Sequence, residues 1–497
     1  MELPFEKTVC RCWSQKICGF YQSENTQELR IPDGMPDAGR IIGAWGQEIL
    51  RGKDWNEREI CVSGGMMIWV LYAPEDGSDP QRLETWIPFQ IRVDMPHTQR
   101  DGVVRAQCVV RSVDARITSS RKLIIRSLVG MMIQTMEPME VSISLPGDLP
   151  EDVEVLRNRY PMNLTVEAGE KTFMMEEDPE LPQGMSPVER IVYFQIDPEI
   201  QEQRIFGNRG VFRGIGNLHV LYWSREGRLC CCDIPVPFSQ YMDLESEYSE
   251  GASVSNLICI TSAELDVTEG GRFHLRCGGV NQYTVQDLSV LDLVEDAYSL
   301  CRDVELQYDS IMIPAILDSR QQTLDLNTRF SGENVSDAVF MSEPWVLTRT
   351  GDDISVSAGG EFGFLTEGNE GLETVVNHAS ESVVIRTDPN ADTCCLGWQK
   401  TPVRCRREGG DWRVDTRVVL DLSSVSKKPV NIVSGMTLGD LKNTCQDRPS
   451  VIIRRKVEQE RLWDLAKNCG STVEAIRRIN RLDIEPEEDR LLLIPVL

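Results

Sequence analysis

The sequence predicts a mostly β protein, in which tandem β-sandwich or barrel-like repeats precede a small α+β module with strand, helix, helix and strand order. Two observations predict the repeats. Segments 36–126 and 186–276 match at an almost constant offset of 150 residues. Short runs of Val, Ile, Leu and aromatic residues are also interrupted by Gly, Asp, Asn or Pro about every 8 to 12 residues. The module is predicted because the apolar spacing becomes helical after residue 450.

Length and composition indicate a folded, multidomain and acidic protein. A chain of 497 residues is too long for a single hydrophobic core. Its 41% hydrophobic and 26% charged residues are close to the average of globular proteins, which argues against general disorder. The formal charge of −26 repels phosphate backbones and anionic lipids, so we expect no nucleic-acid partner.

The repeats are supported by spaced matches that keep the same offset. They include Arg40-Ile41-Ile42 with Arg190-Ile191-Val192, and Val70-Leu71-Tyr72 with Val220-Leu221-Tyr222. A third, more divergent copy contains Phe362-x-Phe364-Leu365. We therefore expect three β-rich repeats and one module, with the ranges 1–145, 146–302, 303–440 and 451–497. The proline-rich, acidic segment 135–185 and the polar segment 423–450 are interpreted as connections, of which the first contributes some strands.

The C-terminal module has two short amphipathic helices. Leu462, Leu465 and Ala466 share one face of the first helix, and Val473, Ile476 and Ile479 form the corresponding stripe on the second. Ser471 precedes Glu474 by three residues, which is the spacing of a capping box. We expect Ser471 to cap the second helix, with a Ser471→Ala cost of about 1 kcal/mol.

These residues, together with Thr472-Val473, Asn480-x-Leu482 and the closing Leu493-Ile494-Pro495, resemble the LysM family. The resemblance implies a βααβ fold with a shallow groove between two loops, which commonly holds glycans that contain N-acetylglucosamine. It implies that partner or glycan contacts are made by the following loop residues: Gln459, Glu460, Arg461, Leu462, Asn480, Leu482, Ile484, Pro486 and Asp489.

The module departs from the family pattern in both loops. Gln459-Glu460-Arg461 replaces the usual Gly-Asp-Thr, and Asp489 replaces a glycine whose backbone freedom allows close approach to a sugar. A protein partner is therefore expected in preference to a glycan. Residues 451–497 also hold nine basic and nine acidic residues, so their net charge is 9 − 9 = 0, unlike the rest of the chain. Two interpretations are open for the arginines of the module: they form a basic face that binds an acidic protein, or they are ordinary solvated charges. These arginines are Arg454, Arg455, Arg477, Arg478 and Arg481.

The whole chain resembles the family of spore-coat morphogenetic proteins that includes SipL and SpoVID. The resemblance is carried by the Val-Leu-Tyr strands, Pro88-Phe89, Ser119-Ser120-Arg121-Lys122-Leu123 and Val304-Glu305-Leu306, followed by one LysM. It implies a cytoplasmic, mother-cell scaffold on the forespore surface that recruits and anchors coat proteins. Its LysM module would bind a SpoIVA-like protein of the basal coat layer. The alternative is a protein that binds peptidoglycan glycan during cortex or cell-wall remodelling.

Nothing in the sequence indicates an enzyme or a cofactor. Four histidines, including His97, are scattered, and no nucleophile elbow, Walker loop or zinc-protease motif occurs. The N-terminus lacks the pattern of a secretory signal, and no apolar run is long enough to insert into a membrane, so we expect a cytoplasmic protein. Trp463 is interpreted as a packing residue in preference to a sugar platform.

The sixteen cysteines are expected to be reduced thiols without a metal. Cys10-x-Cys12 has no second Cys or His pair nearby to complete a tetrahedral zinc site. The contiguous Cys230, Cys231 and Cys232 are interpreted as residues that alternate between the two faces of a strand; crosslinking or oxidation in a mature coat is the alternative.

Overall fold

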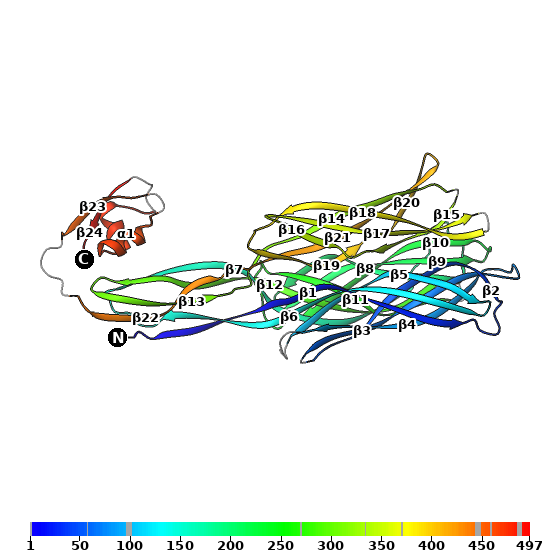
Figure 1. Cartoon of the computed structure of the whole chain (residues 1–497), viewed down its shortest axis with the longest axis horizontal. Coiled ribbons are helices and arrows are strands. Elements are labelled where there is room, and N and C mark those ends of the chain that lie inside the picture. The colour runs from blue at the N-terminus through cyan, green and yellow to red at the C-terminus, as the bar shows by residue number, and fades with distance from the viewer. Residues whose placement is uncertain are drawn as a thin grey trace.

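The computed structural model describes residues 2–56, 58–95, 102–268, 271–332, 334–368, 371–442, 449–457, 460–484 and 490–497. Almost all of its regular structure is antiparallel β-sheet, which confirms the mostly β prediction (Figure 1). Among these residues, no helix combines the length and the apolar character needed to cross a membrane.

One strand-pairing pattern occurs three times in the described chain. The first unit contains β1 (Phe5–Arg30), β2 (Ala38–Trp55), β3 (Glu59–Pro74), β4 (Gln81–Asp94), β5 (Val103–Ser119) and β6 (Lys122–Pro146). The second contains β7 (Val153–Glu177), β8 (Val188–Phe206), β9 (Arg209–Ser224), β10 (Leu229–Asp243), β11 (Ser253–Val267) and β12 (Phe273–Ser299). Each forms two three-stranded sheets, with orders β1-β6-β5 and β2-β3-β4, then β7-β12-β11 and β8-β9-β10.

The third unit keeps this pairing with interrupted strands. Its elements are β13 (Arg302–Ile311), β14 (Ile316–Phe330), β15 (Val335–Ser342), β16 (Val346–Thr350), β17 (Asp353–Gly368), β18 (Gly371–Arg386), β19 (Ala391–Lys400), β20 (Arg404–Glu408), β21 (Asp411–Ser426) and β22 (Val430–Leu441). One sheet joins β14, β21 and β19 with β20, another joins β15, β16 and β18 to β17, and β13 pairs with β22. A proline stands at each of the four interruptions, where it cannot donate to a ladder: Pro314, Pro344, Pro402 and Pro429.

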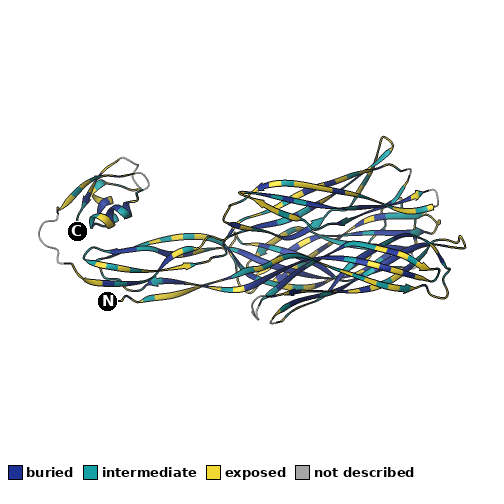
Figure 2. Cartoon of the chain, viewed as in Figure 1, coloured by how far each residue is buried: buried dark blue, intermediate teal, exposed yellow. Residues whose placement is uncertain are grey.

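The three units share a continuous core. Trp45 and Trp69 of the first unit and Val339 of the third pack in the same buried cluster as Tyr193 and Leu218 of the second. Trp45 stacks on Tyr193 with ring centroids 4.5 Å apart. The repeats are therefore packed around one another, and burial is concentrated in the wide part of the molecule (Figure 2).

A narrow stalk extends from this body. It consists of the outer halves of three two-stranded ribbons, β1 with β6, β7 with β12, and β13 with β22 (Figure 1). Small apolar clusters join the ribbons, for example Leu3, Val153, Ala297, Met436 and Leu438. The N-terminal segment closes the stalk, because the Leu3 amide donates to the Met436 carbonyl oxygen at 3.0 Å.

The stalk corrects the prediction that segments 135–185 and 423–450 are mainly connections. β6 continues to Pro146, β7 fills most of the first segment, and β22 lies within the second. The prolines of these strands lie where a missing amide donor is tolerated. Pro138 of β6 lies beyond the end of β5, so that only β1 pairs with it, and Pro161 lies on β7, which is an edge strand. The composition of these segments reflects thin, solvated ribbons.

Candidate binding surface of the C-terminal module

The C-terminal module consists of β23 (Val451–Arg455), α1 (Leu462–Cys469), α2 (Val473–Asn480) and β24 (Leu491–Pro495), with β23 and β24 antiparallel. One sheet face and both helices enclose a small core. Its fully buried members include Leu465, Ala466, Ile476, Leu492 and Ile494. The helical spacing in the sequence places Leu465, Ala466 and Ile476 on the facing sides of the two helices, and Leu492 and Ile494 lie on the inner side of β24.

The helix ends differ by one residue from the expected capping. Thr472 is the N-cap of α2, and its hydroxyl accepts a hydrogen bond from the Ala475 amide at 3.1 Å. Ser471 is buried, and its hydroxyl has no hydrogen-bond partner among the described residues. The prediction that Ser471 caps α2 is therefore wrong, because the chain reaches helical geometry one residue later.

The module is docked on the tip of the stalk through an aromatic contact. Trp463 of α1 is 6% exposed and lies edge-on to Tyr298 of β12, with ring centroids 4.8 Å apart. The Tyr298 hydroxyl donates to the Ser471 carbonyl oxygen at 2.8 Å. Trp463 is thus a packing residue, as expected, but it packs largely against the body.

Acidic residues of β12 complete this docking contact. Asp296 accepts a hydrogen bond from Trp463 Nε1 at 2.8 Å and pairs with Lys467 Nζ at 2.8 Å. Glu295 pairs with Arg461 at 3.6 Å. A β-bulge places one extra residue between Val294 and Asp296, which locally shifts the strand so that consecutive acidic residues both contact the module.

Burial and charge at this contact affect the Tyr298 side chain. Burial raises the pKa of Tyr298, and the nearby carboxylates of Glu154 and Asp296 raise it further. The hydroxyl therefore remains a protonated donor to the Ser471 carbonyl oxygen. Docking through neutral aromatic groups and paired charges fixes which side of the module faces the stalk.

The predicted loop residues have different structural roles. Gln459, Pro486 and Asp489 lie outside the described residues. Ile484 is 78% exposed, whereas Leu482 is half-buried against the module core. The prediction that Leu462 offers a binding surface is wrong, since it is 1% exposed and belongs to the core.

Two other predicted residues hold the module together. The Asn480 side chain donates to the Leu493 carbonyl oxygen at 2.6 Å and accepts from the Leu493 amide at 2.9 Å. Glu460 pairs with Arg454 at 2.9 Å, which connects the start of the first loop to β23. These contacts position the loops, so we assign both residues a structural role.

Four arginines of the predicted basic face are exposed: Arg455, Arg477, Arg478 and Arg481. None of the four forms an ion pair with another described residue. Arg454 differs, because it is half-buried and bound to Glu460. The predicted basic residues that are exposed therefore lie at the end of β23 and at the C-terminal end of α2.

Sequence reasoning missed an apolar surface on the same module. The outward side of the β23–β24 sheet, here called the outer sheet face, consists of Val451, Ile453, Arg455, Leu491 and Leu493. Ile453 and Leu491 are each 62% exposed, and Arg455 lies opposite Leu491 in the ladder. The sequence did contain a signal for this surface. Residues on both sides of these two strands are apolar, although only one side of the sheet can face the helices.

Buried polar groups also converge in the body, between repeats. His219 Nδ1 lies 2.7 Å from Asp233, and its Nε2 lies 2.8 Å from Asp337 of the third unit. These carboxylates raise the pKa of His219 to about 10 against the opposing effect of burial. Tyr193 also donates to Asp337. The imidazolium is thus saturated by partners from two units and acts as an inter-unit contact.

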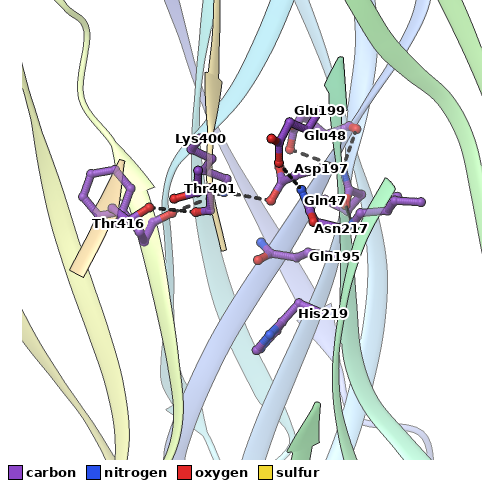
Figure 3. Close-up of polar contacts among 12 residues, drawn as sticks. Gln47, Glu48, Gln195, Asp197, Glu199, Asn217, His219, Lys400, Thr401 and Thr416 are labelled. Atoms are coloured by element: carbon purple, nitrogen blue, oxygen red, sulfur yellow. Dashed lines mark hydrogen bonds and ion pairs between the residues drawn. The ribbon is translucent and has the colours of Figure 1, made fainter. Parts of the chain in front are cut away.

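A second polar group lies beside it (Figure 3). Lys400 of the third unit pairs with Asp197 of the second at 3.2 Å, and Gln195 donates to the Gly46 carbonyl oxygen at 2.7 Å. Burial raises the pKa of Glu48 to about 8, and Asp197 raises it further, against the effect of Lys400. The adjoining cavity is about 50 Å³, far smaller than the several hundred Å³ typical of ligand sites.

The other histidines lie apart from these groups. His274 pairs with Asp178 at 2.6 Å and His378 with Glu343 at 3.2 Å, while His97 lies outside the described residues. Across the described ranges, no three His, Cys, Asp or Glu side chains are grouped to hold a metal ion. The exposed surface of the C-terminal module is therefore the candidate site that geometry supports best. Comparisons with protein-family models, curated proteins and solved structures found no significant match.

Proposed function

We propose that the chain is a non-enzymatic scaffold whose C-terminal LysM-like module binds an acidic, amphipathic segment of a protein partner. The single observation that carries this proposal is the outer sheet face, which exposes Ile453, Leu491 and Leu493 beside Arg455. An exposed apolar strip with a charged border is typical of protein interaction sites.

Charge supports an acidic partner. The module is neutral, so residues 1–450 carry the whole net charge, −26 − 0 = −26. The module already binds acidic side chains of the stalk through Lys467 and Arg461. Arg477, Arg478 and Arg481 remain exposed for a second acidic surface, and opposite charges speed association and favour the correct partner.

The docking contact supports a protein in preference to a glycan. Trp463, the aromatic residue that a sugar would most readily stack on, is covered by Tyr298. The stalk holds the module at one end of a long body (Figure 1). This arrangement suits a tether that presents one binding module and leaves the body for other contacts.

On the resemblance given above, we propose that the scaffold recruits and anchors spore-coat proteins on the forespore surface, on the cytoplasmic side of the mother cell. Its LysM-like module would bind a SpoIVA-like protein of the basal layer. Other coat proteins would bind the repeats.

The test measures binding of the purified full chain to a purified SpoIVA-like protein and, separately, to insoluble peptidoglycan. We expect saturable protein binding that Ile453→Asp weakens at least tenfold, because the new carboxylate enters an apolar, acid-facing contact. Arg477→Glu with Arg478→Glu should also weaken binding and reduce its salt dependence.

The matched control is Val384→Asp in β18, since Val384 is 63% exposed and lies on the body. It should leave binding unchanged. Equal loss of binding in Val384→Asp and Ile453→Asp would contradict the proposed surface. Strong retention on peptidoglycan without binding to the protein would contradict the proposed function.

A further inference from the structure

Two cysteines from different repeats lie against each other in the body. Cys18 belongs to β1 and Cys394 to β19, and their thiols are within hydrogen-bonding contact although 394 − 18 = 376 positions separate them. Cys18 Sγ also donates to the carbonyl oxygen of the adjacent Cys395 at 3.4 Å.

Polar side chains fix this approach between the first and third units. The Gln15 side chain contacts Cys394 Sγ at 3.2 Å through its amide nitrogen. Gln134 Nε2 donates to the Cys395 carbonyl oxygen at 2.7 Å. β-Bulges at Lys16 and Leu396 lie beside the two thiols and locally reorient both strands.

The Cys18 thiol is accessible to small molecules, whereas Cys394 is half-buried beside it. Cys18 is exposed, whereas many other cysteines, such as Cys108 and Cys259, are buried. Cys394 lines a surface pocket of about 280 Å³, which also contains Lys16 and Lys427. A small disulfide can therefore reach Cys18 from solvent, with Cys394 next to it at the edge of the pocket.

We propose that Cys18 and Cys394 form a reversible disulfide that links the first and third repeats when the surroundings become oxidising. The oxidant is a small-molecule disulfide, RSSR. The Cys18 thiolate attacks one sulfur, which forms a mixed disulfide and releases RS⁻. The Cys394 thiolate then attacks the Cys18 sulfur and releases the second RS⁻. In sum, two cysteine thiols and RSSR give one protein disulfide and two RSH.

This link has a structural consequence because it closes a loop of 376 positions. Long loops lose the most unfolded-state entropy when they are crosslinked. The bond would join β1, the first strand of the body, to the last repeat, so the shared core could no longer open by separation of these two units. The oxidised protein should therefore unfold at a higher temperature than the reduced protein.

The test treats the full chain with glutathione disulfide and maps disulfides by mass spectrometry after alkylation and digestion. We expect a Cys18–Cys394 crosslinked peptide, two fewer free thiols than the sixteen of the chain, and a rise in Tm that reduction reverses. Ring closure should be faster at alkaline pH, because the hydrogen bond that the Cys394 thiol makes to Cys18, and burial, raise the pKa of Cys394.

Three variants make the test specific. Cys394→Ser should stop at a stable glutathione adduct on Cys18, and Cys18→Ser should lose both the crosslink and the Tm rise. Cys301→Ser, which removes a half-buried thiol at the tip of the stalk, should behave as the wild type. Separate alkylation of Cys18 and Cys394 after other thiols have oxidised, or a link of either to a different cysteine, would overturn the proposal.

Discussion

Asp296→Ala should release the C-terminal module from the stalk without unfolding either part. The change removes the hydrogen bond from Trp463 Nε1 and the ion pair with Lys467. A buried hydrogen bond to a carboxylate contributes about 1.5–3 kcal/mol. The ion pair adds about 0.2–1 kcal/mol, since Lys467 is 40% exposed and screened by solvent.

Together these losses reach about 2–4 kcal/mol, which corresponds to a roughly 30- to 700-fold shift of the docking equilibrium. Hydroxyl-radical footprinting measures this shift, because Trp463 and Tyr298 are 6% and 5% exposed in the docked state. Their oxidation rates should rise in Asp296→Ala. The matched control is Asp292→Ala on the same strand, which loses only an exposed pair with Arg159.

The expected result requires that the fold itself is retained, as shown by an unchanged circular dichroism spectrum. Unchanged protection of Trp463 in a folded Asp296→Ala protein would refute the docking geometry. A Tyr298→Phe variant tests a third docking interaction, because it keeps the ring contact and the Asp296 interactions and removes only the hydrogen bond to the Ser471 carbonyl oxygen.

Three further outcomes are expected. Thr472→Ala should destabilise the module by about 1 kcal/mol, because the Thr472 hydroxyl caps α2. Ser471→Ala should cost less, because the Ser471 hydroxyl makes no cap. Thermal melts of the two variants would compare these costs. Glu48→Gln should stabilise the body by about 1 kcal/mol or more above pH 8. The pKa of Glu48 in the folded state is raised to about 8, so the stability contributed by its protonated carboxyl is present at low pH and is lost as the pH rises to that value. Urea unfolding of the variant and the wild type at pH 5 and pH 9 would show the difference. Lys53→Met should lower the free energy of unfolding by about 1–3 kcal/mol in urea titrations, because the buried Lys53 ammonium donates to the Val104 carbonyl oxygen and to Gln282 of the second unit, whereas its ion pair with the half-exposed Glu170 is screened by solvent.

The sequence carries enough information to predict the repeats and the module, because both depend on local patterns. The 150-residue offset survives in the paired Val-Leu-Tyr strands, β3 and β9, which form the central strand of equivalent sheets. The helices of the module follow from apolar spacing within single turns. Interrupted copies are harder to recognise, because prolines such as Pro402 divide a strand without changing which strands pair.

The stalk and the docked module could not be predicted in the same way. Stalk ribbons have little buried surface, so their strands show weak alternation and an acidic composition that resembles a linker. The contact between Tyr298 and Trp463 joins positions 463 − 298 = 165 residues apart. The family resemblance assigned Leu462 to a binding loop, although the apolar spacing places it on the inner face of the first helix, where it is buried.

The shared core explains why three similar units in one chain have diverged. Gly43, Tyr193 and Asp337 occupy the same position in their units, each just after a β-bulge and paired with Leu71, Leu221 and Leu365, respectively.

These three residues have complementary sizes and chemistry. A Cβ atom at Gly43 would lie 2.5 Å from the ring of Trp45, which stacks on Tyr193, and the Tyr193 hydroxyl donates to Asp337. Three identical subunits could not place a glycine, a tyrosine and an aspartate at one position. A single fused chain can, so divergence of the third repeat is what allows the three units to pack into one asymmetric body.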